Sequence, residues 1–137
     1  MPARRLILDA EAVSALAHGP MRRRSVVRDA LEAARRSAAE VVVSAAVLAE
    51  LYRGPHFNPG VDAAVAREAL VIADVDREVA RIAGGVLAAA KAGSEDAVDA
   101  FVVATGVDGG GAVVLTGDPR DLRRLAAPYP IVSVVAV

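Results

Sequence analysis

Short runs of branched apolar residues alternate along this chain with longer alanine-rich stretches whose apolar positions recur at helical spacing. The short runs are typical of buried strands, and the longer stretches are typical of amphipathic helices. The pattern predicts five strands, at residues 6–9, 41–43, 70–73, 112–115 and 129–137. It also predicts seven helices, at residues 10–17, 22–37, 44–52, 61–69, 76–92, 94–106 and 119–125. This alternation indicates an α/β fold, with a central, mostly parallel sheet and helices on both faces.

Residues that start and stop helices agree with these boundaries. Gly19 and Pro20 break the first helix, and Pro119 suits the first turn of the last one. N-caps are expected at Ser44, Asp76 and Ser94. The chain shows no internal repeat and no linker, so we expect residues 1–137 to form a single domain.

Composition narrows the class of protein. The 137 residues are 55% hydrophobic and 24% charged, which is typical of a globular domain that buries a sizeable core. No apolar run approaches the roughly 20 residues that span a bilayer, so no association with a membrane is expected. The N-terminal apolar run breaks at Asp9, which argues against a signal peptide. The chain has no cysteine, which excludes disulfides and thiolate metal sites and fits a cytoplasmic protein.

Charge is informative through its distribution. The net charge of −1 does not by itself indicate a nucleic-acid-binding protein. Arginines are clustered, however, at 22–24, at 35–36 and at 120, 123 and 124, and such clusters can bind phosphates if the fold brings them together. The chain has two tyrosines, two phenylalanines and no tryptophan, so base stacking cannot be the main means of recognition.

Acidic residues recur near the predicted carboxyl ends of the strands, where open parallel sheets bind their ligands. The four candidates are Asp9, Glu50, Asp99 and Asp118. Each has a structural alternative: Asp9 could begin a loop, Asp118 could cap the helix at Pro119, and Glu50 could be a solvated helix residue. Gathered together, four carboxylates repel one another unless cations neutralise them. Their joint placement therefore predicts a site for Mg²⁺ or Mn²⁺, which prefer oxygen ligands.

The segment EDAVDAFVVATG (95–106) carries two acids that a helix would place on one side. Asp96 and Asp99 are three residues apart and should point in roughly the same direction. Asp99 directly precedes an apolar run, so we expect it to enter the site from a shielded wall as a metal ligand. Asp96 lies nearer the helix start, where it either interacts with the helix dipole or holds a water bound to the metal.

Four segments in order resemble the PIN-domain ribonucleases, and in particular the VapC-type toxins of bacterial toxin–antitoxin pairs. The segments are LILDAEAVSAL (6–16), VVVSAAVLAELYRG (41–54), DAFVVATG (99–106) and VVLTGDPRDLRRL (113–125). The resemblance implies a PIN-like fold and cleavage of RNA with Mg²⁺ or Mn²⁺. It also implies inhibition by a VapB-type antitoxin, and we expect the chain to form a homodimer.

The same resemblance implies roles for individual residues. Asp9, Glu50 and Asp99 match the acidic triad of the family, and Asp118 matches its fourth acid. Two polar positions that support the site are matched by Ser14 and Thr116. One departure is Ala10-Glu11, where the family often has a small hydroxyl or amide residue. Glu11 is either an extra carboxylate near the metals or an exposed residue.

Other readings of these residues stay open at this point. A phosphatase of the haloacid dehalogenase class needs a DxDx[TV] motif, which residues 9–13 nearly meet, but it gives Glu50 and Asp99 no role. A catalytically dead α/β binding module is a second alternative. Surface charge or contact with RNA phosphates would both explain Arg120, Arg123 and Arg124. We interpret His18 and His56 as surface residues.

Overall fold

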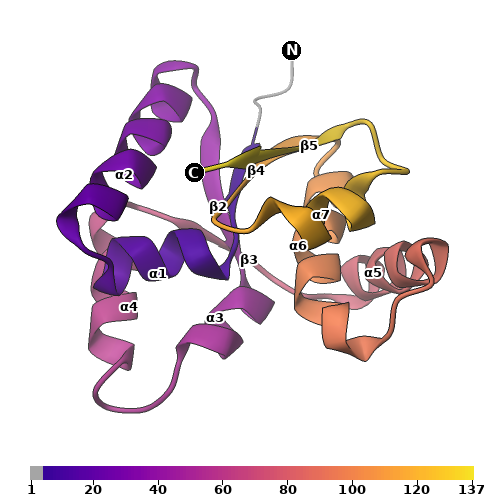
Figure 1. The fold of residues 1–137 in the computed structure, drawn as a ribbon, viewed down its shortest axis with the longest axis horizontal. Helices are drawn as coiled ribbons and strands as arrows, with labels where there is room; N and C mark the ends of the chain where they lie inside the picture. Colours follow the sequence, from indigo (N-terminus) through magenta and orange to yellow (C-terminus); the bar gives the residue numbers. More distant parts are fainter. Residues whose placement is uncertain (1–4) are drawn as a thin grey trace.

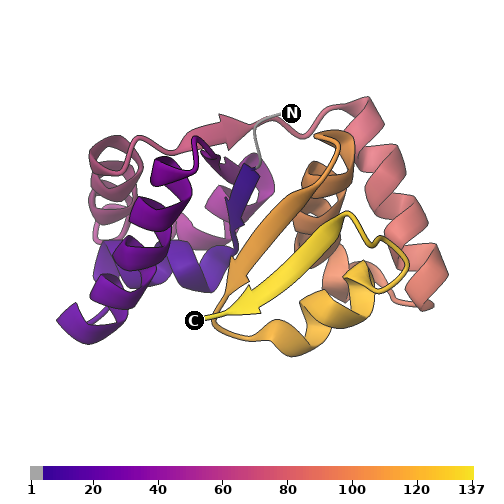
Figure 2. The ribbon, with the colours of Figure 1, turned by 90° about the horizontal axis from the view of Figure 1, so that it is seen from above.

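A sheet of five strands forms the centre of the computed structural model, which describes residues 5–137. The strands are β1 (Arg5–Leu8), β2 (Glu40–Ser44), β3 (Val71–Ala73), β4 (Ala112–Thr116) and β5 (Val132–Ala136). Their order in the sheet is β3-β2-β1-β4-β5, and every neighbouring pair is parallel. In Figure 2 the arrows of β4 and β5 run side by side toward the same end of the sheet. The predicted α/β class is confirmed, and the sheet is parallel throughout.

Helices cover both faces of the sheet, as predicted. Among residues 5–137 the α-helices are α1 (Ala10–His18), α2 (Met21–Arg36), α3 (Ala45–Leu51), α4 (Asn58–Arg67), α5 (Arg77–Ala90), α6 (Ala97–Asp108) and α7 (Pro119–Ala126). Figure 1 shows α1, α2 and α4 on one side of the sheet and α5, α6 and α7 on the other. None of these helices has the length and apolar character that crossing a membrane requires. The argument against a signal peptide rests partly on residues 1–4, which lie outside the described residues.

The core forms where the central strand meets helices from both sides. Leu6, Ile7 and Leu8 of β1 are all buried, which explains why this strand is a continuous apolar run rather than an alternating one. On the face of the sheet that α5, α6 and α7 cover, α6 packs against β1, β2, β4 and β5. Residues 102–106 of α6 are all buried. Gly106 makes this close approach possible, since a Cβ there would lie 3.0 Å from Val132 Cγ2 and 3.3 Å from Ala112 Cβ.

Three predicted starts were wrong by three residues. The helix expected from residue 61 begins at Asn58, because Pro59 suits the first turn of a helix, and α4 ends at Arg67 rather than 69. The helix expected from Ser94 begins with a 3-10 turn (Ser94–Asp96), the N-cap of that turn is Gly93, and α6 starts at Ala97 without a side-chain cap. The last strand begins at Val132 rather than 129, because the chain first makes a turn in which the Val132 N–H donates to the Tyr129 carbonyl over 3.0 Å. The caps predicted at Ser44 and Asp76 are confirmed, since both side chains accept backbone N–H groups of the helices that follow.

A buried carboxylate ties α2 to the end of α4. Glu68 is 7% exposed, and three arginines reach it. Arg28 and Arg67 approach its Oε2 at 3.3 Å, and Arg35 approaches Oε1 at 3.8 Å and also donates to the Glu68 backbone carbonyl. The arginine cluster at 35–36 therefore has a structural role through Arg35.

We expect Glu68→Gln to lower the free energy of unfolding by about 1–2 kcal/mol, because three half-exposed arginines lose a shared, desolvated partner. Chemical denaturation would measure this loss. Asp29→Asn on α2 is the matched control, since Asp29 is exposed and makes no ion pair within residues 5–137. An equal loss in both variants would show that the Glu68 cluster does not stabilise the fold.

Candidate active site

The register of the sheet places Asp9 between the ends of two neighbouring strands. Leu8 is level with Val43 of β2 and with Leu115 of β4. The next residue, Asp9, donates its backbone N–H to the Leu115 carbonyl over 3.1 Å. The side chain of Asp9 thus begins at the carboxyl edge of the sheet, where the sequence placed it.

Both carboxylate oxygens of Asp9 are held by hydrogen bonds. Oδ1 accepts the backbone N–H of Ala12 over 2.9 Å, which caps α1, and Oδ2 accepts the hydroxyl of Thr116. Asp9 is 6% exposed. Burial raises the pKa of this carboxyl, the bonds from Thr116 and Ala12 oppose that rise, and the charge of Glu11 adds to it. Asp9 is therefore fixed in one orientation, and Thr116 is the residue that fixes it from β4.

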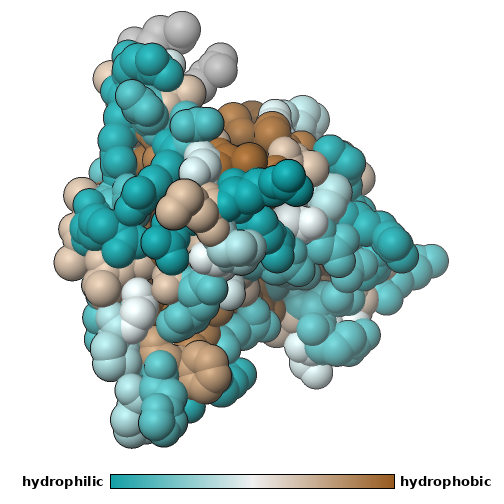
Figure 3. All heavy atoms as spheres, turned by 60° about the vertical axis from the view of Figure 1, so that its left-hand side comes forward, coloured by the Kyte–Doolittle hydropathy of each residue, from teal (hydrophilic) through white to brown (hydrophobic). Residues whose placement is uncertain are grey.

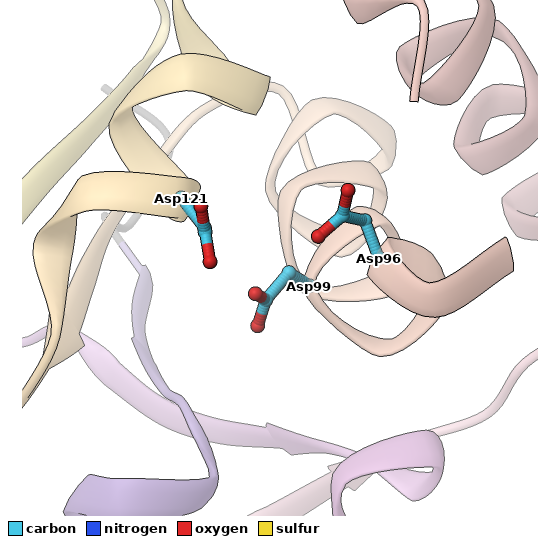
Figure 4. Close-up of side chains that lie close together, drawn as sticks. All are labelled: Asp96, Asp99 and Asp121. Atoms are coloured by element: carbon cyan, nitrogen blue, oxygen red, sulfur yellow. The ribbon is translucent and has the colours of Figure 1, made fainter. Parts of the chain in front are cut away.

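Three other carboxylates gather between α6 and α7. Asp96, Asp99 and Asp121 each offer an oxygen, and these atoms lie within 4.8 Å of one another. Asp96 ends the 3-10 turn, Asp99 lies in the first turn of α6, and Asp121 lies in the first turn of α7. In Figure 4 the side chains of Asp99 and Asp121 point into the same space, and Asp96 reaches toward it from the start of α6. The expectation that Asp96 and Asp99 share one side is confirmed.

Asp99 links this cluster to the acids on the neighbouring elements. Burial and, after it, the negative charges of Asp9, Glu50, Asp121 and Asp96 together raise the pKa of Asp99 to about 6. Asp96 and Asp121 are the two of these acids whose oxygens lie within 4.8 Å of Asp99, and Glu50 is exposed near the end of α3. The acids that act on Asp99 thus come from the N-cap of α1, from α3, from the 3-10 turn before α6 and from α7, which are far apart in the sequence.

Asp118 occupies a different position from the other predicted acids. It is exposed, it is the N-cap of α7 without capping through its side chain, and its N–H donates to the Thr116 hydroxyl over 3.0 Å. The acid on α7 that joins the cluster with Asp96 and Asp99 is Asp121. Asp121 was not among the metal ligands expected from the sequence. The available signal was its place three residues after Asp118, in the first turn of a helix that begins at the sheet edge.

The arginines of α7 differ in their contacts. Arg124 bonds Asp96 Oδ2 over 3.0 Å and lies 3.9 Å from Asp121 Oδ1. Arg120 and Arg123 are exposed and make no ion pair within residues 5–137. Within residues 5–137, Arg124 is therefore the only one of these three arginines that contacts the acids, and Arg120 and Arg123 are available to a ligand.

Glu11 and Ser14 lie on α1, and only Glu11 acts on one of the site acids, through its charge on Asp9. Glu11 is exposed and its carboxylate lies against Gly117, where a Cβ would collide with it. With Ser14, His18 and Arg23, Glu11 lines a pocket of about 360 Å³ between α1 and the start of α2. Both His18 and His56 are exposed, as predicted, and the His18 ring packs edge-on against Phe57 at 5.8 Å between centroids.

Comparison with protein families agrees with this arrangement. The model of the PIN domain matches residues 6–128. The chain belongs to the PIN-domain family. PIN domains are generally nucleases, and they typically use a divalent metal, which the cluster of Asp96, Asp99 and Asp121 could hold. The match gives no support to the phosphatase reading. No curated protein matches this PIN domain.

We expect Asp99→Asn to stabilise the metal-free protein at neutral pH. The folded-state pKa of about 6 lies above the ordinary value of 3.8, so Asp99 favours folding when protonated, and this contribution is lost as the pH rises through 6. The variant should gain on the order of 2 kcal/mol at pH 7.5, since one pKa unit corresponds to about 1.4 kcal/mol and nearby water weakens the effect.

Thermal melting in EDTA at pH 4.5 and pH 7.5 would measure this gain, which should be larger at the higher pH. Asp96→Asn is the matched control. It removes a charge from the same cluster, but it also breaks the ion pair with Arg124, so it should not stabilise the protein. A gain for Asp99→Asn that does not depend on pH would contradict the proposed cause.

Proposed function

We propose that this PIN domain is a metal-dependent endoribonuclease that serves as the toxin of a type II toxin–antitoxin pair. The observation that carries the proposal is the cluster of Asp96, Asp99 and Asp121, whose carboxylate oxygens lie within 4.8 Å of one another, so that their negative charges repel. Such repulsion costs stability, and a divalent cation is the simplest way to offset it. RNA as the substrate rests on the resemblance of the four motifs to VapC-type toxins.

The side chains fit Mg²⁺ or Mn²⁺. All candidate ligands are carboxylates, the donors that hard divalent ions prefer, and three of them offer oxygens within 4.8 Å of one another. Asp96, Asp99 and Asp121 would hold an ion, and Asp9, Glu50 and Asp118 lie on neighbouring elements that could complete the site. When bound, such an ion supplies Lewis-acid chemistry, which activates water and neutralises negative charge on a phosphodiester.

The remaining residues of the site would position the reactants. Thr116 and the N–H of Ala12 hold the Asp9 carboxylate in one orientation, so its oxygens are directed before any ligand arrives. Arg120 and Arg123 are exposed on α7, the helix that carries Asp121, and their guanidinium groups could bind phosphates of the RNA backbone. Binding would therefore depend on the RNA backbone, which agrees with the small number of aromatic residues.

A VapB-type antitoxin is the proposed protein partner. On the side of α1, α2 and α4, apolar patches interrupt a mostly hydrophilic surface, as Figure 3 shows. Met21, Val26 and Phe57 are exposed on this side. An antitoxin segment could bury such residues and direct a basic side chain toward the acids. The exposed Val71, Ile72 and Val135 on the edge strands β3 and β5 could serve a homodimer.

Cleavage of total RNA in saturating Mn²⁺ tests the enzymatic proposal. We expect Asp99→Asn to lower the cleavage rate at least about 100-fold, because a neutral amide is a poor metal ligand. Asp96→Asn should lose about 10-fold or less, because Arg124 already occupies part of its ligand capacity. Equal rates for wild type and Asp99→Asn would rule out the metal site. A folded wild-type protein that leaves RNA intact would favour the binding-module alternative.

Co-expression tests the proposed partner. The chain expressed alone should slow growth, and Asp99→Asn should relieve this effect while remaining folded, because only cleavage depends on the carboxylate. A small protein encoded immediately upstream should co-purify with the wild type and restore growth. Harmless expression of soluble wild-type protein would contradict the toxin role without bearing on RNA cleavage measured in vitro.

A further inference from the structure

Arg124 is the one cation that contacts the acidic cluster within residues 5–137. Its Nη2 lies 3.0 Å from Asp96 Oδ2 and 3.9 Å from Asp121 Oδ1. It therefore bridges the 3-10 turn before α6 and the first turn of α7, and it touches two of the three residues that offer metal ligands. The third residue, Asp99, has no arginine partner within the described part of the chain.

The guanidinium of Arg124 affects metal binding more than it affects the stability of the fold. Ion pairs with side chains as exposed as Arg124 (46%) contribute little to folding. A guanidinium stays charged at any pH that the protein meets, so it cannot stop competing by losing a proton. Its hydrogen bond to Asp96 Oδ2 occupies a carboxylate that a metal ion would use, and its positive charge repels that ion.

We propose that Arg124 is an internal competitor of the divalent metal. In the metal-free protein it holds Asp96 and Asp121 together and replaces part of the missing positive charge. Its presence lowers the affinity of the site for Mg²⁺ and Mn²⁺, and metal binding weakens its bond to Asp96. This inference rests on the metal site proposed above, and it adds a role for Arg124 other than a fixed contact with RNA.

A consequence concerns the order of binding. An Arg124 side chain that leaves Asp96 remains anchored on α7 beside Arg120 and Arg123, where a phosphate group could bind it. A phosphate that draws Arg124 away from the acids strengthens metal binding, and by linkage the metal strengthens phosphate binding equally. The arginine thereby couples the binding of metal to the binding of RNA.

The test measures Mn²⁺ affinity by titration calorimetry, without RNA, in three variants. Arg124→Gln removes the competing charge and should lower the Kd about fivefold relative to Arg123→Gln. Arg123→Gln is the matched control because it makes the same change of net charge on the adjacent, unpaired arginine. Arg124→Lys keeps the charge and should bind Mn²⁺ nearly as wild type does.

Thermal melting provides a second readout that a merely structural contact would not reproduce. Without metal, Arg124→Gln should melt slightly below wild type, because Asp96 loses an exposed counter-ion whose contribution to folding is small. With saturating Mn²⁺ the difference should shrink, because wild type gives up the same bond when it binds the ion.

A Kd for Arg124→Gln that equals or exceeds that of Arg123→Gln would overturn the competition and leave the metal site standing. A wild-type protein that binds no Mn²⁺ would instead refute the metal site, and the inference with it. The outcome is independent of whether RNA is cleaved, so failure of the ribonuclease proposal is recognised separately.

Discussion

Parallel pairing of β1 with both β2 and β4 is the constraint on which the rest of the structure depends. With Leu8 level with Val43 and Leu115, all three strands end at the same edge of the sheet. The helices that follow them begin there and bring their first residues to that edge. Asp9 directly follows the central strand β1. One of its carboxylate oxygens therefore accepts a hydrogen bond from Ala12 of α1, and the other accepts one from Thr116 of β4.

Convergence of the chain at one edge also concentrates negative charge. Asp99 experiences the charges of four other carboxylates, and the protein offsets them in three different ways. Hydrogen bonds from Thr116 and Ala12 stabilise Asp9, the guanidinium of Arg124 stabilises Asp96, and solvent surrounds the exposed Glu50. Asp99 has no arginine partner within residues 5–137, and burial together with the neighbouring charges raises its pKa to about 6. The acid most in need of a cation is thus at the centre of the cluster.

Most of the fold could be predicted from the sequence because apolar periodicity follows directly from burial. The boundary errors arose where local backbone geometry decides, as in the 3-10 turn after Gly93 and the turn before Val132. The acids could be recognised as a group from their places after strands. The sequence could not show whether Asp118 or Asp121 joins the cluster. The two residues are only three positions apart, and the orientation of the helix decides which of them reaches Asp96 and Asp99. The contact between Arg124 and Asp96 spans 28 positions in the chain and left no local signal.

Packing at Gly106, near the end of α6, affects the position of Asp99, near the start of the same helix. The helix lies against β4 and β5 at a distance that leaves no room for a methyl group without a shift of Val132 or Ala112. From residue 106 to residue 99 the helix rises about 10 Å, a length over which it behaves as a rigid rod. A shift of the helix at Gly106 therefore also moves the Asp99 carboxylate. Oxygen–metal distances near 2.1 Å tolerate little error, so shifts of about a few tenths of an ångström are already large. The distance between α6 and the sheet, which the absence of a side chain at Gly106 allows, thus helps to set the position of Asp99 in the acidic site.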